Sequence, residues 1–157
     1  MFAHLNSIGL YGMDAFEVNV EADISNGLPG FDVVGLPDTA VKESRDRVRS
    51  ALKNCGFAFP MSRITVNLAP ADKRKEGPIY DLPILLAILT ASGQLSCDLS
   101  DCAMIGELSL SGEIHGIRGV LPMAIHAKEL GYHRLFVPAV NAAEGAVVEG
   151  LESPPHL

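Results

Sequence analysis

Residues 77–92 have the layout of a turn that presents a catalytic nucleophile. Gly77-Pro78 predict a tight turn, and an apolar helix is expected to begin soon after it, at Leu82. In such a turn a serine hydroxyl can attack a carbonyl once a base takes its proton. This chain has Ile79 where the serine would stand, and an aliphatic side chain has no nucleophilic atom. The segment therefore has the form of an active-site scaffold without its chemistry.

A basic run forms the second candidate site. Lys73, Arg74 and Lys75 fall in a polar loop expected over residues 69–76. A solvated loop is the simpler interpretation of this run. The functional alternative is a contact for DNA phosphates or for a partner, and phosphate contacts of this kind carry no sequence information.

The sequence indicates neither a metal site nor a nucleotide site. The histidines show no ligand spacing with cysteines or carboxylates; they are His4, His115, His126, His133 and His156. A phosphate-binding Walker A loop needs Gly-Lys followed by Ser or Thr. None of the 15 glycines precedes a lysine. We therefore expect no metal and no cofactor in this chain.

Composition favours one globular, cytoplasmic domain. A chain of 157 residues with 48% hydrophobic residues can bury a core without disulfide or metal support. The net charge of −7 argues against non-specific nucleic-acid binding by the whole surface, because neutralising phosphates requires Lys and Arg. Three cysteines without Cys-x-x-Cys spacing suit a reducing cytosol. The apolar run 82–91 is shorter than the ~20 residues that span a bilayer, so no membrane insertion is expected.

Hydrophobic periodicity predicts strands and helices in mixed order. Alternation and turn residues predict strands over 2–10, 15–24, 31–36, 63–68, 135–137 and 146–148, and a hairpin of 104–110 with 113–117. Helices are expected over about 38–54, 82–92 and 122–131, with one helical turn at 141–144. Asp38 is the expected N-cap of the first helix. The first three strands suggest an antiparallel meander. The whole order predicts an α+β fold in which a mixed β-sheet has helices packed over one face.

Four segments together resemble one known family. They are Gly-Leu-Pro-Asp at 35–38, Asn-Leu-Ala-Pro-Ala-Asp at 67–72, the turn at 77–82, and Gly-Glu-Leu-Ser-Leu at 106–110. These segments resemble the Mg-chelatase-like proteins known as YifB or ComM. The resemblance covers roughly residues 1–151 and implies a ribosomal-S5-domain-2-like fold, the fold of the Lon protease domain. Residues 152–157 would then form a disordered tail.

The same segments resemble Lon protease more distantly. In Lon the turn reads Gly-Pro-Ser-Ala-Gly, and the catalytic lysine follows a Gly-Gly pair after the hairpin. The serine position here is Ile79, the pair corresponds to Arg118-Gly119, and the lysine position falls on Leu121. Both positions of the Ser–Lys dyad are thus aliphatic, and both side chains are expected in the core. Asp81-Leu82 is closer to the inactive Lon-like domain of the DNA-recombination protein RadA.

The resemblance implies a role without catalysis by this chain. Members of the family continue into an AAA+ ATPase module, and the ComM branch is associated with DNA branch migration during natural transformation. We therefore expect a scaffold that holds a homo-oligomeric ring or couples an attached motor to DNA, with ATP and Mg implied only for that module. Two alternatives remain: a divergent peptidase or hydrolase with an unrecognised nucleophile, and a stand-alone protein-interaction domain.

Overall fold

The computed structural model describes residues 1–146. The strands are β1 (Phe2–Tyr11), β2 (Asp14–Ser25), β3 (Gly30–Val34), β4 (Arg63–Ala69), β5 (Cys102–Met104), β6 (Glu107–Leu108), β7 (Ile114–His115) and β8 (Arg134–Phe136). The helices are α1 (Thr39–Lys42), α2 (Ser44–Asn54), α3 (Asp81–Ala91), α4 (Val120–Glu129) and α5 (Ala142–Ala146), with single 3-10 turns η1 (Pro78–Tyr80) and η2 (Ala139–Asn141). The mixed α+β class predicted from the sequence is confirmed.

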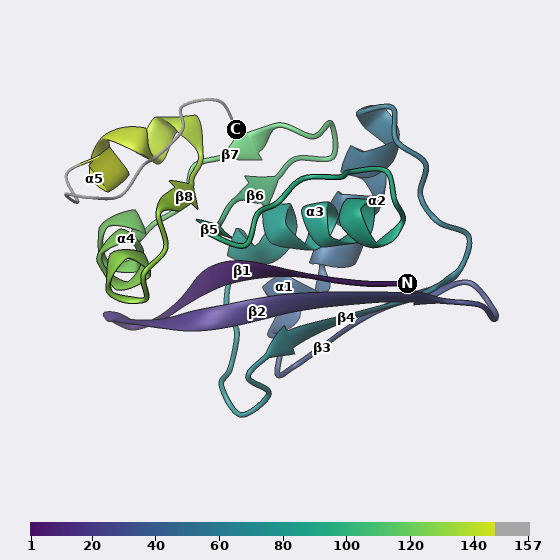
Figure 1. Cartoon of the computed structure of the whole chain (residues 1–157), viewed down its shortest axis with the longest axis horizontal. Coiled ribbons are helices and arrows are strands. Elements are labelled where there is room, and N and C mark those ends of the chain that lie inside the picture. The colour runs from purple at the N-terminus through teal and green to yellow at the C-terminus, as the bar shows by residue number, and fades with distance from the viewer. Residues whose placement is uncertain (147–157) are drawn as a thin grey trace.

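A mixed sheet forms the centre of the molecule. Within residues 1–146 its six strands have the order β3-β4-β2-β1-β5-β8, and β6 pairs with β7 in a separate ribbon. The pairs β1–β2 and β2–β4 are antiparallel, whereas β3–β4, β1–β5 and β5–β8 are parallel. Figure 1 shows the long β1 and β2 running side by side beneath α3, with β3 and β4 at one margin.

The predicted antiparallel meander of the first three strands is wrong. β3 pairs in parallel with β4, so that Val33 lies opposite Val66, and β4 in turn lies against β2. Parallel neighbours need a crossover connection, which α1 and α2 supply between β3 and β4. Order along the chain therefore did not predict order in the sheet.

Helices cover both faces of the sheet, which corrects the prediction that they lie over one face. The side chains of β5 show that the helices lie on two faces, because successive side chains in a strand point to opposite faces of the sheet. Cys102 and Met104 belong to the hydrophobic cluster that contains the buried residues of α2 and α3. Ala103, between them, belongs to the cluster that contains Met123 and the other buried residues of α4.

The predicted helices are present with altered limits. Asp38 caps α1 as predicted, since its Oδ1 accepts a hydrogen bond from the Val41 amide at 2.8 Å. The helix expected over 38–54 is divided at Glu43 into α1 and α2, and the division places Ser44 in the interior. α3 is the expected helix that is buried nearly all round, while α4 begins at Val120, two residues before the predicted start.

Other boundaries also differ from the sequence prediction. The predicted hairpin is reduced to β6 and β7, because the chain at Met104 has joined the main sheet as β5. The helical turn predicted at 141–144 lies within η2 and α5. Of the strand predicted at 146–148, Ala146 ends α5, and the remainder lies outside the described residues, as do the boundary at 151 and the tail 152–157. No helix within residues 1–146 is long and apolar enough to cross a membrane.

Tyr80 ends the 3-10 turn inside the core. Its side chain is fully buried, and its hydroxyl is the one buried side-chain polar atom in residues 1–146 without a hydrogen-bond partner. Burial raises the pKa of this phenol, so it stays neutral. Gly9 makes room for it, since a Cβ there would meet Tyr80 Oη at 2.5 Å and Phe16 Cζ at 2.6 Å.

We expect Tyr80→Phe to raise the free energy of unfolding by about 1 kcal/mol, because it removes an unpaired polar atom from the core without changing the ring. Urea unfolding measures this. Tyr11→Phe is the matched control, and it should change stability by less than about 0.5 kcal/mol because the Tyr11 side chain is 61% exposed. A Tyr80→Phe variant that loses stability would contradict the assignment of an unpaired hydroxyl.

Candidate functional site

The turn at 77–81 joins three parts of the structure. Gly77 has a φ of 79°, a left-handed conformation that favours glycine. Its amide donates to Asp38 Oδ2 at 3.1 Å, while the other oxygen of Asp38 caps α1. Pro78 then opens η1, and Asp81 begins α3. One carboxylate therefore connects the start of α1 with the turn.

Ile79 lies at the centre of this turn beside a cavity. It is partly buried and packs against both hydrophobic clusters. Its carbonyl accepts a hydrogen bond from the Gly106 amide at 2.9 Å, and the Leu82 amide donates to the Gly106 carbonyl at 3.1 Å. The neighbouring cavity has a volume of about 360 Å³ and is lined by Gly77, Pro78, Ile79, Glu107, Gly116, Ile117 and Arg118.

Leu121 does not join Ile79 at this cavity. It is 40% exposed and is not among the described residues that line the cavity. The prediction that both side chains are core residues is therefore wrong for Leu121. Successive residues on a helix point about 100° apart, and Val120, fully buried, takes the inward position of the first turn of α4. The cation that lines this cavity with Ile79 is instead Arg118, and arginine is not a proton acceptor of the kind that a Ser–Lys dyad needs.

Asp81 forms a buried polar centre directly after the turn. Its side chain is fully buried and accepts four hydrogen bonds from three residues. Ser44 Oγ donates at 2.5 Å, and Arg47 donates from Nε at 2.6 Å and from Nη2 at 3.1 Å. The Leu108 amide donates at 3.0 Å. Asp81 thus connects α3 with α2 and β6.

The electrostatics of this centre favour a permanent ion pair. Burial alone lowers the pKa of Arg47, but the hydrogen bond and the charge of Asp81 outweigh it, so the pKa lies above its ordinary value. This centre was not predicted from the sequence, in which Arg47 and Asp81 are 34 residues apart. A signal was present, since Ser44, Val48 and Ala51 have the i, i+4, i+7 spacing of a buried stripe.

Lys75 is not part of an exposed basic run. It is fully buried, and its ammonium donates to the carbonyls of Gly35, at 2.7 Å, and Pro70. Burial lowers its pKa. Its backbone also bonds the segment before α1, with its amide donating to the Leu36 carbonyl and its carbonyl accepting from the Asp38 amide, each at 3.0 Å. Lys75 therefore holds the loop in place and cannot contact a surface ligand.

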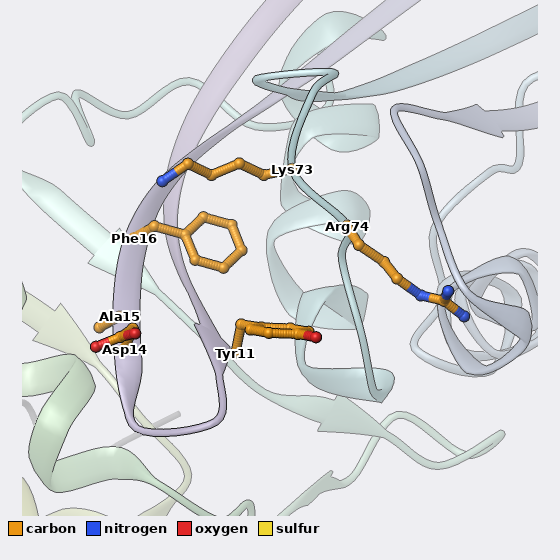
Figure 2. Close-up of a pocket in the computed structure, with 6 residues that line it drawn as sticks. All are labelled: Tyr11, Asp14, Ala15, Phe16, Lys73 and Arg74. Carbon is orange, nitrogen blue, oxygen red and sulfur yellow. The ribbon is translucent and has the colours of Figure 1, made fainter.

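Lys73 and Arg74 remain exposed and line a pocket of about 400 Å³ with Tyr11, Asp14, Ala15 and Phe16. The Lys73 ammonium lies 5.0 Å from the centre of the Phe16 ring. Arg74 forms an ion pair with Glu76 at 3.6 Å. Figure 2 shows the Lys73 chain passing over Phe16, while the Arg74 guanidinium extends away from the other labelled side chains. Lys73 is thus the cation directed at this pocket.

The other candidate ligands do not assemble. Among residues 1–146 no group of three or more His, Cys, Asp or Glu side chains is placed to hold a metal ion. His156 lies outside the described residues.

We expect Asp81→Asn to lower the free energy of unfolding by about 3 kcal/mol, because it leaves the Arg47 charge largely buried without its partner. Glu43→Gln is the control, because Glu43 pairs with the same guanidinium at 3.5 Å but is 61% exposed. It should cost less than about 1 kcal/mol. Equal losses in urea unfolding would contradict the structural role of Asp81.

Comparisons with known proteins agree with the resemblance noted in the sequence. The family described as subunit ChlI of Mg-chelatase matches residues 20–141. YifB of Salmonella typhimurium, described as uncharacterized, is 48% identical over 149 residues, which are 93% of this chain and 29% of YifB. The competence protein ComM of Haemophilus influenzae is 49% identical over 138 residues, 87% of this chain and 27% of ComM.

A more distant relative is the Lon protease of Leptospira interrogans, 27% identical over 125 residues, which cover 78% of this chain and 15% of the protease. The chain spans less than a third of the length of the curated relatives it matches. The family match covers well over half of the chain, and the YifB and ComM identities extend it to nearly the whole length. The chain therefore belongs to the family of Mg-chelatase subunit ChlI, together with the YifB and ComM proteins.

Proposed function

We propose that this chain is a non-catalytic scaffold domain with the Lon protease-like, ribosomal-S5-domain-2-like fold. Its longer relatives support the proposal that it is one part of a Mg-chelatase-like protein. Residues 1–151 form this domain. The rest of the protein carries an AAA+ ATPase module that binds ATP and Mg²⁺.

The proposal that the domain is non-catalytic rests on one observation. The turn that resembles the Lon nucleophile turn is occupied by Ile79, and its polar neighbours Asp38 and Asp81 are committed to bonds that hold α1, α2 and β6. None of the described residues that line the adjacent cavity carries a hydroxyl, thiol or amine in its side chain. A turn with these contacts serves to fix α3 rather than to present a nucleophile.

The role of the whole protein follows from the same family relationship. One relative is named a competence protein, and we propose that this protein acts in the cytoplasm on DNA during recombination. The scaffold contributes to a homo-oligomeric ring around the attached motor. DNA reaches the domain at Lys73 and Arg74, which are exposed on one loop. The complete reading frame tests the attached motor, since a frame without Walker motifs after residue 151 would overturn it.

Peptidase assays with unfolded casein test the inactive site. We expect no cleavage by the unaltered chain, by Ile79→Ser, or by the double variant Ile79→Ser/Leu121→Lys. A serine at position 79 would lack the lysine of the Ser–Lys dyad as its partner, and a lysine at position 121 would start from a side chain outside the cavity. Cleavage by the unaltered chain would overturn the scaffold proposal. Cleavage by the double variant alone would show that α4 can turn position 121 inward.

DNA binding tests the contact at the loop. In the protein from the complete reading frame, Lys73→Ala/Arg74→Ala should weaken DNA binding and reduce the slope of log K against log salt by about 2, because about 0.9 counterions are released per duplex phosphate contact. Lys53→Ala/Lys128→Ala removes the same charge from other exposed positions and should leave the slope unchanged. A double variant of the loop with an unaltered slope would exclude DNA from this contact.

A further inference from the structure

Strand β3 ends the sheet with an unused edge. It pairs with β4 on one side, and no strand among residues 1–146 pairs with its other side. An edge strand presents unpaired backbone N–H and C=O groups, which can pair with another extended chain. In Figure 1, β3 lies at the margin of the sheet away from α4 and β8.

A groove with a volume of about 430 Å³ runs along this edge. It is lined by Asp32, Val33, Val34, Lys42, Arg45, Arg63 and Thr65. The two sides of the groove differ because side chains alternate along β3. Val33 points towards the core with α2, the side from which α1 and α2 bring Lys42 and Arg45. Val34 points to the opposite face and is 44% exposed.

The groove is positive although the chain as a whole is acidic. Arg63 pairs with Asp32 at 2.6 Å, which leaves this face nearly neutral. Neither Lys42 nor Arg45 forms an ion pair within the described part of the chain. The local excess of positive charge contrasts with a net charge of −7. A ligand of this groove should therefore carry acids on the side that faces α1 and α2.

We propose that the β3 edge binds an extended acidic segment of a partner protein by strand addition. The backbone of the segment hydrogen-bonds to β3, as in other peptide complexes formed at a sheet edge. Acidic side chains at alternate positions meet Lys42 and Arg45, and the side chains between them lie beside Val34. The preferred segment thus alternates acidic and apolar residues.

A labelled peptide that alternates glutamate and valine is the probe, and fluorescence anisotropy with the 157-residue chain measures its binding. Lys42→Ala/Arg45→Ala should weaken the affinity about 2- to 30-fold, because two exposed ion pairs are lost. Lys53→Ala/Lys128→Ala is the charge-matched control, and it should bind the peptide like the unaltered chain. A peptide that alternates lysine and valine should not bind.

A chemically modified peptide distinguishes strand addition from simple charge attraction. N-methylation of alternate amides on the edge that faces β3 removes the backbone donors without changing charge, so it should abolish binding. Unchanged binding of the methylated peptide would overturn strand addition. The proposed class of partner would be overturned if the parent peptide did not bind. It would also be overturned if a single-stranded oligonucleotide bound through Lys42 and Arg45 while the peptide did not bind.

Discussion

A single buried carboxylate holds the central elements of this domain together. Asp81 is fully buried, and such a charge is tolerated only when partners satisfy it completely. The partners come from α2 and from Leu108 of β6, so both elements must be in place before Asp81 can be buried. The position of α3, and with it the packing of most of the larger hydrophobic cluster, depends on this one constraint.

The same constraint explains why the turn before α3 keeps its form without a nucleophile. The Gly77 amide donates to the carboxylate of Asp38, and the carboxylate of Asp81 accepts from the Leu108 amide. Ile79 is hydrogen-bonded to Gly106 through its backbone alone. The side chain at position 79 is therefore free of any bonding role, and an aliphatic group there fills space between the two clusters. The form of this turn is therefore set by its backbone and carboxylate contacts and does not require a particular side chain at position 79.

Charge on the surface is divided among sites with different uses. The basic run at 73–75 separates into a buried lysine that holds the loop and two exposed cations. The cations of α1 and α2 also differ in exposure and contacts. Arg47 points inward to Asp81, whereas Lys42 and Arg45 line the groove beside β3. A net negative charge on the chain thus coexists with local positive surfaces, because position in the fold decides which cations reach solvent.

The sequence by itself determined the elements that depend on neighbours along the chain: the alternating strands, the apolar helix after Gly77, the cap at Asp38, and the absence of a hydroxyl at Ile79. Tertiary structure decided which strands pair, which face α4 covers, and the exposure of Leu121. It also decided which charged side chains are buried and which are exposed. Arg47 and Asp81 are 34 residues apart, and Lys75 binds a carbonyl 40 residues away. A charged residue has the same local pattern whether solvated or buried, because only its distant partners make burial favourable.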